Sequence, residues 1–121
     1  MFLKAFDHVN VKTSRLEEMV RWYDEVLGLK RGKRPAFPFP GAWLYLNETA
    51  IIHLVEVVTE PEAIDPKIEH FAITADGKDE FLAHLKSHGV EADISEVPDF
   101  GITQVNIWDP DGNHIHIDFG T

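Results

Sequence analysis

The chain has no cysteine among its 121 residues, so no disulfide can stabilise it, and any bound metal must take nitrogen or oxygen ligands. Basic residues are few: 11 lysines and arginines stand against 21 aspartates and glutamates, giving a net charge of −10 at pH 7. That charge argues against nucleic acid or an anionic membrane as a partner. Long apolar runs are missing too, since none approaches the roughly 20 residues of a membrane span, and no secretory leader opens the chain. We take the cytoplasm as the default location.

What is present is typical of a folded domain. The chain is 44% hydrophobic and 26% charged, and its length suits one domain with a real core. Two segments resemble each other: "FDHVNVKT" at residues 6–13 and "IEHFAITA" at residues 68–75. Each is a short alternating strand that leads into a helical pattern and then into further strand-like stretches. We therefore predict an α+β fold of two tandem βαβββ modules, at about 1–58 and 68–121, joined by a linker at 59–67.

The helices have recognisable ends. Ser14 followed by Glu17 is a capping-box signature and predicts that the first helix opens at Ser14, while Gly28 predicts its end. The second helix is predicted to stop at Gly89.

The histidines follow the repeat. The interval from His8 to His70 matches the interval from His53 to His116 to within a single position. Two pairs of histidines thus occupy equivalent positions, on the first and last strands of each module. Imidazole is the commonest metal ligand, so four histidines in register favour a metal site over solvated or core residues.

The strand alternation predicts two faces for each sheet. An aliphatic face would pack under the helix, and the opposite face would carry imidazoles, amides and aromatics, as in a small-molecule pocket. The predicted substrate pocket residues on that face are Asn10, Trp43, Tyr45, Gln104, Asn106 and Trp108. The three aromatic side chains could equally be packing at an interface.

These segments resemble the vicinal oxygen chelate superfamily, which includes glyoxalase I, bleomycin-resistance, fosfomycin-resistance and extradiol-dioxygenase proteins. The resemblance spans nearly the whole chain, through "DHVNV", "RWYDEVLGL", "GAWLYL" before "IIHLVE", "EHFAIT" and, most specifically, "DPDGNHIHI". It implies that the paired modules form open curved sheets, a cup around a divalent metal. Carried over by position, the metal ligands are His8, His53, His70 and His116.

The chain departs from the family at two of these positions. In glyoxalase I-like members the residues matching His53 and His116 look like glutamates, and the last of them can act as a base. Imidazoles in their place leave the metal charge uncompensated and remove that carboxylate. We assign His116 and Asp118 as the catalytic residues, with Asp118 either orienting an imidazole or replacing the base.

Four nitrogen ligands suit zinc, nickel, cobalt, copper or iron(II) better than magnesium or calcium. The leading prediction is a metal-dependent glyoxalase-like lyase or isomerase, in which a small substrate chelates the metal through adjacent oxygens and an enediolate is stabilised. The alternatives are an iron(II)-dependent dioxygenase and a non-catalytic drug- or metabolite-binding protein like the bleomycin-resistance members.

Weaker signals have ordinary explanations. His84 and His88 lie four apart on a helix and could chelate, but surface histidines are commoner; His114 lies next to a turn, where solvation is expected. Asp109 and its neighbours are interpreted as a turn rather than a calcium loop. The basic cluster "KRGKR" at residues 30–34 is interpreted as a solvated loop.

Each module supplies two of the four histidines, and the linker is short. In small family members the paired modules usually come from two subunits. We therefore predict a homodimer in which His8 and His53 of one chain meet His70 and His116 of the other, with a monomer as the alternative.

Overall fold

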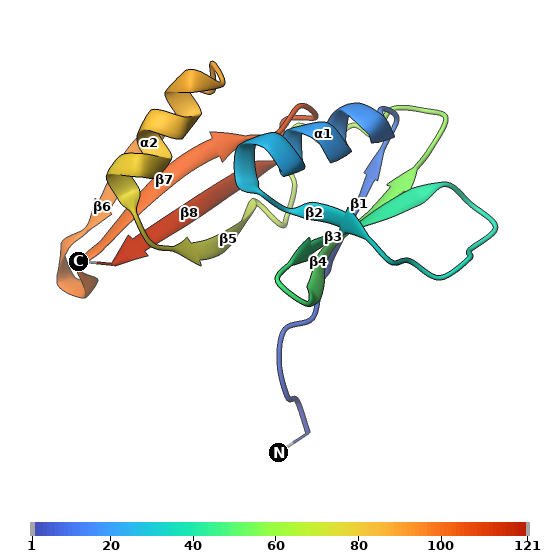
Figure 1. Cartoon of the computed structure of the whole chain (residues 1–121), viewed down its shortest axis with the longest axis horizontal. Helices are drawn as coiled ribbons and strands as arrows, with labels where there is room; N and C mark the ends of the chain where they lie inside the picture. Colours follow the sequence, from blue (N-terminus) through green and yellow to red (C-terminus); the bar gives the residue numbers. More distant parts are fainter. Residues whose placement is uncertain (1, 121) are drawn as a thin grey trace. The chain divides into compact units, whose positions relative to one another are not determined.

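The computed structural model describes residues 2–120, which form two compact units divided between residues 62 and 63. The division falls within residues 59–67. Each unit has the βαβββ order predicted from the repeat, which confirms the α+β fold of two tandem modules (Figure 1).

The first unit is a four-stranded sheet with one helix. Its elements are β1 (Val9–Thr13), α1 (Leu16–Leu27), β2 (Lys30–Gly32), β3 (Gly41–Leu46) and β4 (Thr49–Glu56). The strand order is β1-β4-β3-β2, with β1 parallel to β4 and the other pairs antiparallel. The last strand of the unit therefore lies beside the first.

The second unit repeats this topology. Its elements are β5 (His70–Ala75), α2 (Lys78–Ser87), β6 (Asp93–Val97), a 3-10 turn η1 (Pro98–Phe100), β7 (Ile102–Trp108) and β8 (His114–Gly120). The order is β5-β8-β7-β6, again with the first and last strands parallel.

Each sheet buries one aliphatic face, as the alternation predicts. In the first unit Leu44, Ile52 and Leu54 are fully buried, together with Met19 and Tyr23 of α1. In the second unit the buried set comprises Leu85, Val105, Ile107, Ile115, Ile117 and Phe119. The Phe81 and Phe119 rings lie 5.6 Å apart, which joins α2 to β8. The opposite face of each sheet is left for polar and aromatic side chains.

The predicted start of the first helix is wrong. The N-cap is Arg15, not Ser14, and its side chain makes no capping hydrogen bond. The first amides are met from elsewhere: Arg15 N–H donates to Thr13 Oγ1 at 3.1 Å, and Leu16 N–H donates to Glu56 Oε2 at 3.4 Å. Because strand side chains satisfy these donors, Ser14 is not needed as a cap.

The helix ends are closer to prediction. Gly28 has a φ of +70° and its N–H donates to Asp24 O, so the glycine ends α1 in the left-handed conformation. Helix α2 ends at Ser87, two residues before Gly89. Within residues 2–120, neither helix has the length and apolar surface that crossing a bilayer would require.

Candidate functional site

The first unit brings His8 and His53 together. His8 directly precedes β1, and His53 lies in the middle of β4, where Trp43 of β3 is its cross-strand partner. The His8 and His53 rings stack with centroids 3.6 Å apart, and Trp43 stacks on His53 at 3.9 Å. His53 is therefore held between an imidazole and an indole.

His53 is buried, and its neutral form is favoured in this arrangement. Its residue is 9% exposed, and its Nε2 contacts the Ala50 carbonyl oxygen at 3.1 Å. Burial, and secondly the nearby His8, hold the pKa of His53 below the usual 6.5. A neutral imidazole keeps a lone pair, which a metal ligand requires.

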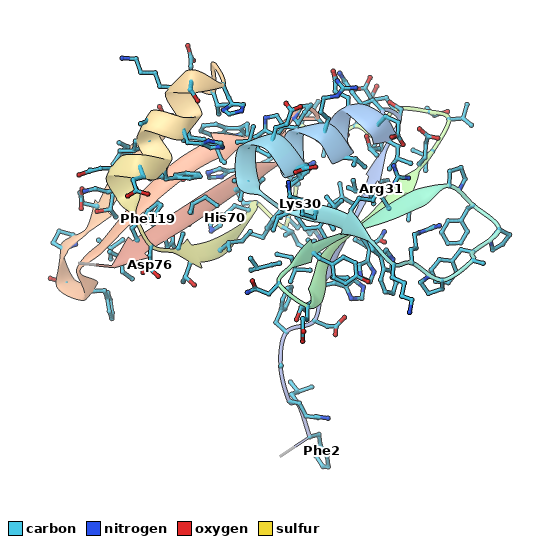
Figure 2. The ribbon with its side chains drawn as sticks, viewed as in Figure 1. Phe2, Lys30, Arg31, His70, Asp76 and Phe119 are labelled. Carbon is cyan, nitrogen blue, oxygen red and sulfur yellow. The ribbon has the colours of Figure 1, made fainter. Side chains whose placement is uncertain are left out.

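The second unit repeats this pairing. His70 opens β5 (labelled in Figure 2), and His116 lies on the neighbouring parallel strand β8, with ring centroids 3.9 Å apart. In each unit the first histidine is more exposed than its partner. The side chains of His8 and His70 are 37% and 38% exposed, whereas that of His116 is 9% exposed and His53 is buried. The two histidine pairs, which the sequence predicts to be equivalent, therefore also share the same ring contact and the same difference in burial.

Asp118 lies directly behind His116. Its Oδ1 is 3.1 Å from His116 Nδ1, and its side chain is only 20% exposed. Because a carboxylate accepts hydrogen bonds, this contact favours the tautomer with the proton on Nδ1 and the lone pair on Nε2. Of its two anticipated roles, orienting an imidazole is the one its position supports.

Glu69 and His114 were not among the predicted site residues, yet both lie beside His70. Glu69 contacts His70 Nδ1 at 2.9 Å and also His114 Nδ1, and His114 Nε2 is 2.8 Å from Asn106 Oδ1. Trp108 stacks on the His114 ring with centroids 4.9 Å apart. The His114 side chain is only 17% exposed, so the solvated position expected for it is wrong.

Sequence signals for both residues existed. His114 alternates in phase with His116 and Asp118, which places all three on one face of β8. Glu69 precedes His70 as Asp7 precedes His8, and Asp7 Oδ2 is 2.6 Å from His8 Nδ1. The sequence repeat therefore includes an acidic residue before the first histidine of each module, and this signal could have identified Glu69.

The ring of His114 is hydrogen-bonded at both nitrogens. The Asn106 amide nitrogen donates to Asp93 O at 2.9 Å, which leaves Oδ1 as the acceptor facing His114 Nε2. With Glu69 accepting at Nδ1, both ring nitrogens of His114 face hydrogen-bond acceptors. In turn the hydrogen bond from His114, and then that from His70, lower the pKa of Glu69.

The predicted pocket residues divide into two groups. Five of them share a face with the histidines: Asn10 and Trp43 flank His53, Asn106 pairs with His116, Gln104 pairs with Asp118, and Trp108 pairs with His114. Tyr45 forms the second group by itself. It pairs with Lys30 of β2 in the same register in which Trp43 pairs with Gly32, its hydroxyl donates to Lys33 O at 2.5 Å, and its ring covers Gly32.

The basic cluster at residues 30–34 also makes ion pairs with nearby acidic side chains. Lys30 pairs with Asp24, and Arg31 lies 3.1 Å from both carboxylate oxygens of Glu17. With Gly32, Lys33 and Tyr45 these two residues line a shallow depression beside β2 (Figure 2 labels Lys30 and Arg31). Part of the predicted solvated loop is thus strand β2.

The donor set suits a borderline metal such as zinc, nickel, cobalt or iron(II). Each unit presents two imidazoles in ring contact, and the lowered pKa of His53 favours its neutral form. A smaller group, Glu69, His70 and His114, also offers three ligand atoms within 4.8 Å of one another. His70 belongs both to this group and to the histidine pair of the second unit.

Comparisons with known proteins show which family this chain resembles. A family model described as the Glyoxalase/Bleomycin resistance protein/Dioxygenase superfamily matches residues 5–117. "Glyoxylase I 4" of Arabidopsis thaliana is 31% identical over 126 aligned positions, covering 97% of this chain and 71% of the relative.

Solved structures share the fold. A glyoxalase family protein from Bacillus anthracis superposes with a TM-score of 0.83 at 23% identity, covering 100% of this chain and 98% of the other. The trypanothione-dependent glyoxalase I of Leishmania major superposes with a TM-score of 0.71 at 20% identity, covering 95% and 86%. The chain therefore belongs to the glyoxalase, bleomycin-resistance and dioxygenase superfamily, the vicinal oxygen chelate proteins.

Proposed function

We propose that this chain is a metal-dependent, glyoxalase-like enzyme of the lyase or isomerase type. The observation that carries the proposal is the equivalent histidine pair in each unit, with ring centroids at 3.6 Å and 3.9 Å. Both pairs lie on or directly beside adjacent parallel strands whose other face is core. The ligands in this proposal are His8, His53, His70 and His116, and the metal is zinc, nickel, cobalt or iron(II).

The substrate class follows from the donor set and the family. A divalent metal supplies Lewis acidity, which favours a small molecule with two adjacent oxygens that can chelate it. The amides of Asn10 and Gln104 and the rings of Trp43 and Trp108 are on the faces that carry the histidines. They would orient such a molecule and shield it from water.

The proton-transfer group in this proposal is the His116–Asp118 pair. Asp118 accepts the Nδ1 proton, so the Nε2 lone pair of His116 can serve either as a ligand or as a proton acceptor, one at a time. This pair takes the place of the glutamate expected at position 116 in glyoxalase I-like relatives. Replacement of Asp118 should therefore slow proton abstraction strongly and lower the free energy of unfolding only slightly.

A non-catalytic binding protein is the second candidate. It is favoured by one observation: Glu69 and Asp118 already accept hydrogen bonds from imidazoles, so neither is a free carboxylate base. Such a protein would bind its ligand and metal without exchanging substrate protons.

Metal content is the first test. Protein purified without a metal-affinity tag should contain a stoichiometric transition metal, and His70→Ala and His116→Ala should lose it while remaining folded. A matched control is His88→Ala on the C-terminal side of α2, whose ring is 4.4 Å from His84 and which should keep the metal. Unchanged metal content in both site variants would contradict the proposed ligands.

Proton exchange then separates the two candidates. The metal-loaded enzyme should exchange the carbon-bound α-protons of small α-hydroxycarbonyl compounds with deuterated water, which proton NMR measures. Asp118→Asn should slow this exchange when both proteins are assayed at saturating metal. Stoichiometric metal with no exchange for any such compound would favour the binding protein.

Shared sites are tested by mixing two inactive chains. One carries His8→Ala with His53→Ala, and the other carries His70→Ala with His116→Ala. If two chains contribute to one site, subunit exchange should restore one intact set of four histidines and with it metal binding. Proven exchange without restored binding would assign all four ligands to a single chain.

A further inference from the structure

Every proposed ligand histidine uses one ring nitrogen for a hydrogen bond inside its own unit. The four contacts are His8 Nδ1 with Asp7 Oδ2 at 2.6 Å, His70 Nδ1 with Glu69 Oε1 at 2.9 Å, His116 Nδ1 with Asp118 Oδ1 at 3.1 Å, and His53 Nε2 with Ala50 O at 3.1 Å. Three of the four partners are carboxylates, and the fourth is a backbone carbonyl.

These contacts determine which ring nitrogen is available. Carboxylate and carbonyl oxygens only accept hydrogen bonds, so the ring nitrogen facing each of them carries the proton. A neutral imidazole has one N–H, and its other nitrogen therefore has the lone pair. The available atom is Nε2 in His8, His70 and His116, and it is Nδ1 in His53.

The exception at His53 has a cause in the repeat. Asp7 and Glu69 are equivalent positions, because each directly precedes the first histidine of its module. The position equivalent to Asp118 in the first unit is Val55, which follows His53 as Asp118 follows His116 and offers no carboxylate. His53 instead turns its Nε2 to the Ala50 carbonyl of its own strand.

The carboxylates also change the charge of the site. Histidines at positions 53 and 116 remove two negative charges that glutamate ligands would give to the metal. Asp7, Glu69 and Asp118 place three negative charges one imidazole further out. A carboxylate that accepts a hydrogen bond from a ligand imidazole raises the basicity of that imidazole and fixes its orientation. The three carboxylates therefore partly compensate for the two missing glutamate charges.

We propose that Asp7, Glu69 and Asp118 are the positioning residues of the metal site, making His8, His70 and His116 Nε2 ligands while His53 is an Nδ1 ligand. This inference rests on the proposed function, because it requires the metal. It goes beyond that function by naming the ligating atoms and the residues that select them.

Glu69 is the residue with a competing assignment. It could itself be a ligand together with His70 and His114, since these three offer ligand atoms within 4.8 Å of one another. In our assignment Glu69 accepts from both imidazoles, and His114 is held off the metal by Glu69 and Asn106. His114→Ala therefore keeps metal stoichiometry in our assignment and abolishes it in the competing one.

Tautomers can be read without any metal. Long-range proton–nitrogen NMR spectra of the ¹⁵N-labelled, metal-free protein, recorded above pH 7.5, distinguish Nδ1–H from Nε2–H forms. We expect Nδ1–H for His8, His70 and His116 and Nε2–H for His53. On adding Zn²⁺, the nitrogen resonances that shift most should be the Nε2 atoms of the first three and Nδ1 of His53.

Zinc affinity tests the carboxylates themselves, by competition with a chromophoric chelator. Asp118→Asn, Glu69→Gln and Asp7→Asn remove charge but keep an acceptor oxygen. Their side chains are 20%, 63% and 82% exposed, and water screens the more exposed charges better. Affinity should fall roughly 10- to 100-fold for Asp118→Asn, less for Glu69→Gln and least for Asp7→Asn.

Asp76→Asn is the matched control, an exposed aspartate that follows β5 and is labelled in Figure 2. It should leave affinity unchanged within a factor of about two. Unaltered affinity in all three carboxylate variants, or loss of stoichiometry in His114→Ala, overturns the inference while leaving a metal enzyme in place. A wild-type protein that binds no transition metal overturns the proposed function and this inference together.

Discussion

Asp109 should be the acidic residue outside the proposed metal site whose replacement destabilises the fold most. It is 5% exposed at the turn between β7 and β8, and its carboxylate collects three local hydrogen bonds. Oδ1 accepts from the backbone N–H of Asp111 and of Asn113, both at 2.9 Å, and Oδ2 accepts from Asn113 Nδ2 at 2.8 Å. Gly112, with a φ of +85°, completes a turn that directs the chain into β8.

Removing this carboxylate leaves three donors without their acceptor. Hydrogen bonds to a charged group contribute about 1.5–3 kcal/mol each, and part of that is returned when water reaches the turn. We expect Asp109→Ala to lower the free energy of unfolding by about 3 kcal/mol and the melting temperature by on the order of 10 °C. Asp109→Asn keeps two of the three acceptor contacts and should cost about half as much.

Thermal unfolding by circular dichroism measures the global loss, and hydrogen exchange locates it. Amides of β8, which follows the turn, should exchange faster in Asp109→Ala, while those of β3 and β4 in the other unit should change little. Asp65→Ala, an exposed carboxylate of the same unit, is the control and should be neutral. A loss below about 1 kcal/mol for Asp109→Ala would show that the turn does not depend on this side chain.

Two further changes test the first unit. Gly41→Ala would place a methyl group closer than van der Waals contact to the Leu54 carbonyl oxygen, so β3 must shift and urea unfolding should show a loss of about 1–3 kcal/mol; Gly120→Ala, which meets open space, should show none. Because the pKa of His53 is held below 6.5 in the fold, its neutral form is favoured there, and its stabilisation is complete above pH 6.5 and is lost as pH falls below that value. The urea midpoint of metal-free protein should therefore fall between pH 7.5 and pH 5, and a slope unchanged by His53→Gln would contradict this cause.

The arrangement of the histidines within each unit could be predicted because it follows from the sequence repeat. The spacing of His8, His53, His70 and His116 follows from two copies of one topology, and ring contact within each pair follows from the parallel pairing of first and last strands. Alternation alone identified the core face. These features depend on periodicity, which a sequence displays directly.

What escaped prediction depends on side-chain partners. His114 was expected in solvent because it adjoins a turn. Instead it contacts Glu69, which directly precedes β5, and Asn106 and Trp108 of β7. The bulge in the pairing of β3 with β4, between Leu44 and Tyr45, was not predicted either. Such partners and irregularities depend on contacts distant in sequence, which spacing does not encode.

The strand order has a consequence for how the protein folds. In each unit the last strand to be synthesised is inserted between the first strand and the third, so β1 has no sheet neighbour until β4 exists. The pairing of β1 with β4 joins positions as distant in the chain as Val9 and Ile52, and such long-range pairing is slow because a large loop must close first. His8 directly precedes β1 and His53 lies in β4, so the two histidines meet only when this loop has closed. The proposed ligand pair of each unit should therefore come together only in the last folding step and be separated first when the unit opens.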